Sequence, residues 1–183
     1  ILNAVKELPE QPLCFNVDVD TLSVEIDYQN GTFNMTALSA EDFPLTPAME
    51  NGVTTITLES LAFAENLSRS LFATAQDEIR PVMGGVYFDL TSDYLAIVAT
   101  DGHKLVRNRI LSVSADEPAS FILPQKPARL LKGVLSKNDG DVVVKFNQRS
   151  AEIRFADGML SCRLIEGRYP NYNSVIPTNN TNC

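Results

Sequence analysis

The alternation of apolar and polar positions predicts a chain built mainly from short strands. Residues 95–100 are apolar or small on both faces of an extended chain, a pattern typical of a fully buried strand. Asp101-Gly102 follows and predicts a tight turn, because glycine adopts a positive φ at little cost. The apolar pattern resumes at Leu105, so the stretch Tyr94–Arg107 predicts a central hairpin. Its exposed tip carries residues 100–104, including His103, the single histidine of the sequence.

The same reasoning predicts further strands and three helices. Strands are expected at residues 15–19, 22–28, 32–38, 86–90, 104–110, 119–123, 142–146, 152–155 and 160–164. Asn30-Gly31 and Asp157-Gly158 predict the turns of two hairpins. Apolar residues three or four positions apart predict helices at 1–8, 58–75 and 126–135, with Thr57 as the N-cap of the second. Residues 46–52, which include Pro47 and Gly52, are interpreted as a linker.

An internal repeat relates the two ends of the chain. The pattern Glu25-Ile26-x-Tyr28-x-Asn30-Gly31 recurs at an offset of 127 residues, between Glu152 and Gly158. A predicted helix precedes each copy, and an aromatic residue followed by proline closes each one, at residues 43–44 and 169–170. This shared order predicts tandem copies of one unit that stack edge to edge. The first copy lacks the front half of the second, so we expect the chain to belong to a longer protein.

Composition indicates a globular protein of a reducing compartment. The chain has 183 residues, of which 44% are hydrophobic and 21% charged, a balance typical of folded domains. No run approaches the roughly 18 apolar residues of a membrane span, and no signal-peptide pattern occurs. Cys14, Cys162 and Cys183 lack Cys-x-x-Cys spacing, which argues against a disulfide framework. We therefore expect a cytoplasmic protein in which Cys14 and Cys162 are buried as small apolar residues.

The basic residues are clustered, although the formal net charge of −8 argues, taken alone, against nucleic-acid binding. Residues 125–138 contain four basic residues and no acidic one, and Arg69 lies on the polar side of the preceding predicted helix. A spacing of three residues places Lys126, Arg129 and Lys132 on one helix face. This face could contact the phosphates of duplex DNA, or it could be an ordinary solvated surface. The residues alone leave both interpretations open.

A catalytic interpretation would rest on the hairpin tip. Asp101 and His103 could form an acid–base or metal-binding pair, with Asp77 or Glu78 as a further carboxylate. However, the sequence shows no nucleophile elbow, no glycine-rich phosphate loop and no carboxylate cluster suited to two-metal phosphoryl transfer. This scarcity favours a binding protein over a hydrolase. A protein-interaction module without a role in DNA binding is a further alternative.

Three motifs together resemble one known family. Residues 99–105 read A-T-D-G-H-K-L, residues 166–172 read E-G-R-Y-P-N-Y, and residues 38–44 read L-S-A-E-D-F-P. The first two resemble the signatures A-T-D-G-H-R-L and [ED]-G-R-[FY]-P-[DN]-Y of the bacterial sliding clamp, the beta subunit of DNA polymerase III. The third resembles the end of the first domain in that family. Lys104 replaces the usual arginine, and Ser174 lies where the family often has arginine.

The resemblance implies an α+β DNA-clamp fold, made of tandem units of two helices packed on antiparallel sheet. Residues 1–50 would be the C-terminal part of domain one, residues 53–177 a complete middle domain, and residues 178–183 a linker toward a third domain. Two three-domain subunits would form a homodimer ring around double-stranded DNA and would not read its sequence. The residues expected to face DNA are Arg69, Lys126, Arg129, Lys132 and Lys137.

The resemblance also implies a partner groove and no catalysis. In the family, a cleft beside the third domain takes short hydrophobic peptides from the polymerase alpha subunit, the clamp loader and repair proteins. The matching residues are Arg80, Val82, Met83, Thr100, Gly102, His103, Lys104, Leu105, Pro170 and Val175. The chain would serve DNA replication as a processivity factor with no catalytic residue, cofactor or metal. The nucleotidyltransferase activity of a DNA-directed DNA polymerase would belong to the holoenzyme.

Overall fold

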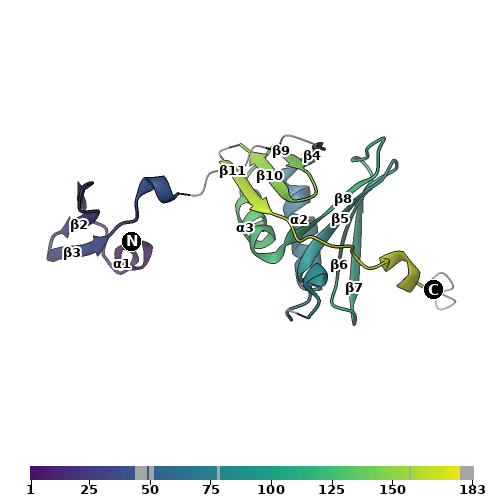
Figure 1. Cartoon of the computed structure of the whole chain (residues 1–183), viewed down its shortest axis with the longest axis horizontal. Coiled ribbons are helices and arrows are strands. Elements are labelled where there is room, and N and C mark those ends of the chain that lie inside the picture. Colours follow the sequence, from purple (N-terminus) through teal and green to yellow (C-terminus); the bar gives the residue numbers. More distant parts are fainter. Residues whose placement is uncertain (44–48, 50–51, 78, 157, 178–183) are drawn as a thin grey trace. The chain divides into compact units, whose positions relative to one another are not determined.

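The chain forms two compact units, which are described separately. The computed structural model describes residues 1–43, 49, 52–77, 79–156 and 158–177 (Figure 1). The first unit is Ile1–Pro47 and the second is Ala48–Cys183. Most of the predicted linker 46–52 and all of residues 178–183 lie outside the described residues. No helix among the described residues is long and apolar enough to cross a membrane.

The second unit contains two four-stranded antiparallel sheets. One sheet has the order β11-β10-β9-β4, with β4 (Thr54–Glu59), β9 (Asp141–Phe146), β10 (Ser150–Phe155) and β11 (Gly158–Arg163). The other has the order β7-β6-β5-β8, with β5 (Gly85–Leu90), β6 (Leu95–Thr100), β7 (Leu105–Ile110) and β8 (Ala119–Pro124). Hairpins join β5 to β6, β6 to β7, β9 to β10, and β10 to β11.

Two helices pack on each other and against both sheets, so the main apolar core of the second unit lies between the helices and the sheets. The helices are α2 (Ser60–Leu71) and α3 (Gln125–Leu135), which lie between the sheets in Figure 1. The core takes residues from each layer, among them Phe63 and Leu131 from the helices and Phe88 and Ile153 from the sheets. Phe88 stacks on Phe121, with ring centroids 4.5 Å apart. The α+β clamp-like arrangement expected from the resemblance is confirmed.

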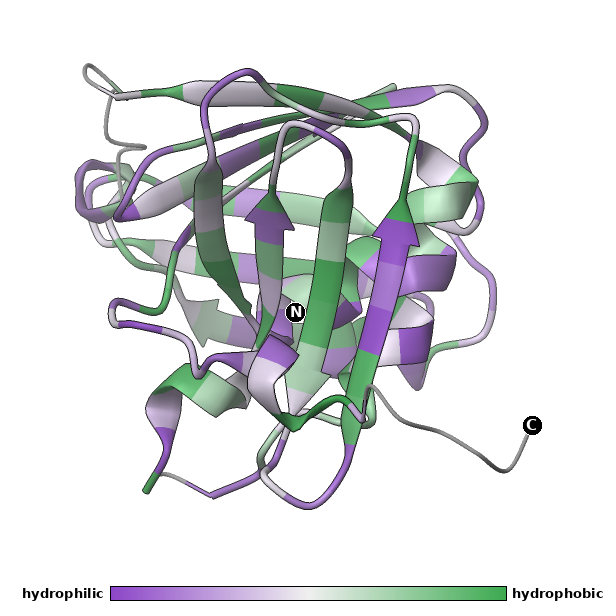
Figure 2. Ribbon diagram, turned by 90° about the vertical axis from the view of Figure 1, so that its right-hand side faces the viewer, coloured by the Kyte–Doolittle hydropathy of each residue, from purple (hydrophilic) through white to green (hydrophobic). Residues whose placement is uncertain are grey.

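The central hairpin is confirmed, and its first strand is the most buried of the sheet. All six residues of β6 are buried, because β5 and β7 flank the strand and both of its faces are covered. Figure 2 faces this sheet and shows one inner strand that is hydrophobic over nearly its whole length. A strand covered on both faces has apolar residues at every position, and this pattern allowed the strand to be predicted from the sequence.

The predicted helix 58–75 is wrong at both ends. Residues 54–59 form β4, which pairs with β9 from Thr54 opposite Phe146 to Glu59 opposite Asp141. The N-cap of α2 is therefore Glu59 and not Thr57. β-Branched residues at 54–57 favour an extended chain when a strand edge is within reach. At the other end, the helix stops at Leu71, and the segment that follows is held by the Gln125 side-chain amide, which donates to the carbonyl oxygen of Ala75 at 2.8 Å.

The first unit contains a short helix and a three-stranded sheet. The helix α1 (Leu2–Lys6) is shorter than the predicted 1–8, and the strands are β1 (Cys14–Asp18), β2 (Ser23–Tyr28) and β3 (Gly31–Thr36). Shifting β2 and β3 by 127 residues gives the bounds of β10 and β11, and the pairing of Ser23 with Thr36 matches that of Ser150 with Arg163. The predicted repeat is therefore confirmed for this hairpin.

The environments of two cysteines differ from the expectation that both are buried. Cys14 is exposed, as are all five residues of the strand β1 on which it lies. Cys162 is half-buried on β11, and burial raises the pKa of its thiol to about 11. At that pKa the Cys162 side chain is an uncharged thiol at neutral pH and behaves as a small apolar group.

A candidate partner groove beside the hairpin tip

The hairpin tip is held by a dense set of hydrogen bonds. The Asp101 carboxylate accepts hydrogen bonds from the backbone amides of His103 and Lys104, at 3.0 Å each, and it also pairs with the Lys104 ammonium. The buried Thr100 hydroxyl donates to the carbonyl oxygen of Lys104 and accepts from the Gly102 amide. The Lys104 side chain and these amides hold the pKa of Asp101 well below its usual range. The tip is thus a fixed rather than an open loop.

A second turn lies beside this tip. One oxygen of Asp77 accepts hydrogen bonds from the amides of Ile79 and Arg80, and the other pairs with the Arg80 guanidinium at 3.0 Å. The hydrogen bond from the Arg80 side chain is the main reason that the pKa of Asp77 is lowered. Arg80 then begins the single turn η2 (Pro81–Gly84), since the Met83 amide donates to its carbonyl oxygen at 2.9 Å.

The tip and the second turn touch at Gly102. A β-carbon at this position would lie 2.6 Å from Nη1 of Arg80, and the residue has a φ of +90°. The left-handed backbone favours glycine, and a β-carbon would also force the Arg80 guanidinium to shift. The two turns line a shallow hollow of about 480 Å³. Its other lining residues are Phe72, Thr74, Gln76 and His103.

The apolar groove residues pack on the outer face of the sheet that contains β6. Val82 and Leu105 are half-buried against a second apolar cluster, whose buried members are Ala96, Val98, Ile122, Tyr169 and Tyr172. Val82 lies close to Gly167, where an added β-carbon would be 2.7 Å from its Cγ1 and where φ is +133°. Met83 is half-buried, and its carbonyl oxygen accepts a hydrogen bond from the Ala75 amide. The turn η2 is therefore anchored on two sides.

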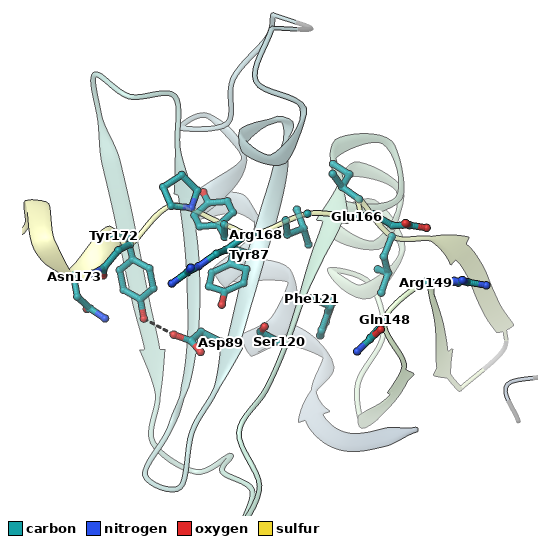
Figure 3. A pocket seen from close by; sticks show the side chains of 17 residues that line it. Tyr87, Asp89, Ser120, Phe121, Gln148, Arg149, Glu166, Arg168, Tyr172 and Asn173 are labelled. Carbon is teal, nitrogen blue, oxygen red and sulfur yellow. Dashed lines mark hydrogen bonds between the residues drawn. The ribbon is translucent and has the colours of Figure 1, made fainter. Parts of the chain in front are cut away.

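A C-terminal strap, residues 164–177, crosses this outer face. The Ile165 amide donates to the carbonyl oxygen of Ile122, and Tyr169 stacks on Tyr87 with ring centroids 4.4 Å apart. The Tyr172 hydroxyl donates to Asp89 at 2.8 Å (Figure 3). Burial raises the pKa of Tyr169 to about 12, and burial together with Asp89 raises that of Tyr172. The motif at residues 166–172 thus ties the strap to the sheet through aromatic side chains.

The strap also borders a polar hollow that sequence reasoning missed. This hollow, of about 780 Å³, lies between the strap, the outer face of β5 and β8, and the turn that carries Gln148 and Arg149 (Figure 3). It is lined by polar side chains that include Asp89, Ser120 and Arg168. The lining comes from four separate segments, of which only the strap, through the motif at residues 166–172, gave a signal in the sequence.

The structure brings some predicted groove residues together and separates others. Arg80, His103 and Lys104 line the hollow at the tip, and Gly102 touches Arg80. Pro170 borders the polar hollow instead, and Val175 is 67% exposed in the turn η3 (Tyr172–Val175). The Thr100 hydroxyl is engaged inside the tip, so its methyl-bearing side chain contributes to shape rather than to polar contact. Whether these residues form one binding groove stays a prediction.

The predicted DNA-facing residues lie on solvent-exposed parts of the two helices and the turn after α3. Lys126, Arg129, Lys132 and Lys137 are exposed, and the guanidinium of Arg129 donates to the Gln125 side chain at 3.1 Å. Arg69 on α2 is paired with Glu65 at 2.9 Å, with both side chains largely exposed. The positive charge of this face therefore resides mainly in the residues of α3 and the turn that follows it.

Asp101 is a poor base for the acid–base alternative at the tip. A carboxylate as strongly stabilised as Asp101 is a weak base at neutral pH. Among the described residues there is no cluster of three His, Cys, Asp or Glu side chains that could hold a metal ion. Glu78, named above as a further carboxylate, lies outside the described residues.

Comparisons with known proteins agree on one family. The family described as "DNA polymerase III beta subunit, central domain" matches residues 57–171. The beta sliding clamp of Synechocystis sp. is 31% identical over 192 residues, covering 94% of this chain and 49% of that protein. That of Halalkalibacterium halodurans is 29% identical over 178 residues, covering 94% of this chain and 46% of that protein. The chain thus spans about half the length of the curated relatives it matches.

Solved structures show the same likeness. The sliding clamp of Bartonella birtlesii, bound to griselimycin, matches with a TM-score of 0.83 at 27% identity, over 97% of this chain and 49% of that one. The Bacillus subtilis clamp matches with a TM-score of 0.81 at 24% identity, over 97% of this chain and 46% of that one, which supports the fold alone. Because the family match covers more than half of the 183 residues, the chain belongs to the DNA polymerase III beta subunit family, and residues 57–171 correspond to its central domain.

Proposed function

We propose that this chain is part of a sliding clamp, a processivity factor that encircles duplex DNA and tethers the replicative polymerase. The observation that carries the proposal is the exposed basic residues of α3 in a protein whose net charge is −8. A basic helix face on an acidic body attracts the DNA backbone on one side and repels it elsewhere. Contacts of this kind hold phosphates without reading bases, which suits a protein that must slide.

The contribution of individual basic residues is expected to differ. Lys126, Lys132 and Lys137 extend toward solvent as compact charges on flexible stems. Arg69 is paired with Glu65, and the negative charge of Glu65 offsets part of the attraction of Arg69 for a phosphate. We therefore assign most of the DNA attraction to the α3 face and a smaller share to Arg69.

The groove beside the tip is the second part of the proposal. Val82, Met83, Leu105 and Val175 supply apolar surface, and Arg80 with Lys104 supplies a polar rim, a combination suited to short hydrophobic peptides. The expected partners are the polymerase alpha subunit, the clamp loader and other proteins with a similar peptide. The griselimycin complex of the Bartonella birtlesii clamp makes this compound a direct probe of binding by the full-length protein.

The proposed assembly follows the family pattern. Residues 1–50 would be the C-terminal part of domain one, residues 53–177 would be the middle domain, and residues 178–183 would lead to a third domain. Two such subunits would close into a homodimer ring in the cytoplasm. The protein would catalyse no reaction itself, and polymerisation would be carried out by the enzyme that it tethers.

Charge reversal tests the DNA-facing assignment. In the full-length protein, Lys126→Glu, Arg129→Glu and Lys132→Glu together are expected to reduce loader-dependent loading on DNA and the length of DNA made per binding event. Each lost phosphate contact removes part of a salt-dependent interaction, so the defect should be largest at low salt and should shrink as salt screens the remaining contacts. Glu152→Lys, on the sheet away from the helices, is the control for an altered charge. Unchanged loading and processivity in the triple variant would overturn the assignment.

A further inference from the structure

Asp77 and Asp101 begin two turns that are built in the same way. In each turn, one carboxylate oxygen accepts hydrogen bonds from the amides two and three residues later. The other oxygen pairs with the basic side chain three residues later, Arg80 in the first turn and Lys104 in the second. The repeated pattern Asp-x-x-Arg and Asp-x-x-Lys therefore places two internally paired basic groups beside the candidate groove.

The two turns meet through Arg80. Its Nη2 is bound by Asp77 at 3.0 Å, while its Nη1 lies so close to Gly102 that a β-carbon there would be 2.6 Å away. The guanidinium is thus paired with the carboxylate of one turn and packs close to Gly102 of the other. Asp77, Arg80, Asp101 and Lys104 all line the same hollow, so the contact occurs at one place on the surface.

We propose that Asp77 is a positioning residue of the partner groove, which holds Arg80 against the hairpin tip at Gly102 and neutralises its charge. This inference rests on the proposed function and adds a residue and a partner preference to it. The backbone of Arg80 begins η2, which carries Val82 and Met83. Holding the Arg80 side chain against the tip therefore helps to fix these apolar residues relative to Leu105, which begins β7 directly after the tip.

The pairing also sets which peptides the groove prefers. Arg80 and Lys104 are each balanced by an aspartate, so the rim of the groove has little net charge. An acidic peptide would have to compete with Asp77 and Asp101 for these basic groups, whereas an uncharged apolar peptide would not. The structure therefore favours an uncharged apolar partner segment, with binding that depends weakly on salt.

Replacing Asp77 with asparagine separates its two roles. Asp77→Asn keeps a side-chain oxygen for the amides of Ile79 and Arg80, so the turn can still form, but it removes the charge that pairs with the guanidinium. Two end-blocked hexapeptides rich in leucine and phenylalanine, one uncharged and one with two aspartates, serve as probes for the full-length protein. Glu152→Gln is the matched control, because it makes the same charge change in the Glu152–Arg154 pair on β10.

Fluorescence anisotropy at low and high salt measures the affinity of each peptide for each protein. The uncharged peptide should bind Asp77→Asn about threefold to fivefold more weakly than the parent, the range expected for loss of an exposed ion pair. The acidic peptide should bind the variant more tightly than the parent, and this gain should disappear at high salt. Glu152→Gln should behave as the parent. Equal affinities and equal salt dependence in Asp77→Asn and parent would overturn the inference.

Hydrogen exchange keeps the test independent of peptide binding. If the parent bound neither peptide, the proposed groove function would fail, and exchange at the amides of residues 102–104 would then decide the positioning role. Faster exchange at these amides in Asp77→Asn, with Glu152→Gln unchanged, would support Asp77 as the residue that holds the tip. Unchanged exchange at the tip would refute that role.

Discussion

Val17 and Val144 occupy equivalent places in the two copies of the repeat, yet one is 59% exposed and the other 1%. They are separated by the same 127 residues that relate β2 to β10, and they lie on β1 and β9. In the second unit, α2 and α3 cover the face that carries Val144. In the first unit β1 is an edge strand whose five residues are all exposed, whereas Val24 and Ile26 of β2, on the same face as Val17, are buried.

This difference predicts that the same substitution has unequal effects at the two sites. In the 183-residue chain, Val144→Asp should lower the free energy of unfolding of the second unit by about 3 kcal/mol or more, because it places an unpaired charge in the core. Val17→Asp should change stability by no more than about 0.5 kcal/mol. Urea denaturation followed by circular dichroism measures both. Similar losses at the two sites would contradict the burial difference.

Strong local patterns made much of the fold predictable. β6 could be predicted because it is apolar or small at every position. The repeat could be predicted because Tyr28 and Phe155 precede matching turns. β4 was not predicted as a strand, because its extended conformation depends on pairing with β9. In that pairing Thr54 lies opposite Phe146, which is distant in the sequence. The exposure of Cys14 likewise depends on what covers β1, and the local pattern carries no such information.

The candidate site was predictable in part. The tip was found because Asp101-Gly102 signals a turn, and Gly102 was retained by the motif. The second turn at Asp77 was not recognised, although the spacing Asp77 to Arg80 repeats that of Asp101 to Lys104. Its importance comes from the contact between Arg80 and Gly102, which is tertiary. The polar hollow beside the strap is assembled from distant segments for the same reason.

Gly102→Ala should weaken the groove. The positive φ and the adjacent guanidinium both disfavour a β-carbon, so we expect a loss of about 1–2 kcal/mol in stability. We also expect weaker binding of the uncharged peptide, because Arg80 must move. Thermal unfolding and peptide anisotropy of the full-length variant measure the two effects.

Gly133→Ala is the matched control for this substitution. Gly133 lies in α3, and an added methyl group there would meet no described atom within 4 Å. Alanine is the better helix former, so stability should rise by about 0.5–1 kcal/mol with peptide affinity unchanged. A Gly102→Ala variant as stable and as competent as the parent would show that the tip tolerates a β-carbon.

Ionisation of the buried Tyr169 should lower the free energy of unfolding at alkaline pH. Its hydroxyl is buried and makes no hydrogen bond of good geometry with the described residues, and burial raises its pKa to about 12. A group with a raised folded pKa contributes its stability fully below the unfolded value, near 10 for tyrosine, and loses it as the pH rises through the folded value. The folded state should therefore lose stability between about pH 10 and pH 12.

Tyr169→Phe provides the comparison. Because the hydroxyl lacks a well-placed partner, phenylalanine should be tolerated at neutral pH, with stability within about 1 kcal/mol of the parent. The variant should also lose less stability than the parent over the alkaline range, as followed by circular dichroism in urea at each pH. An identical alkaline decline in both proteins would argue that other groups cause it.

The most direct test of the clamp proposal asks whether DNA is held by topology. The full-length protein is loaded with its clamp loader onto nicked circular DNA, the circle is cut once, and retention is followed by gel filtration. A ring that encircles DNA should stay on the closed circle and leave after linearisation, even at salt concentrations that screen phosphate contacts. Equal retention on circular and linear DNA would indicate ordinary affinity and contradict the account, and absence from both would favour a protein-interaction module instead.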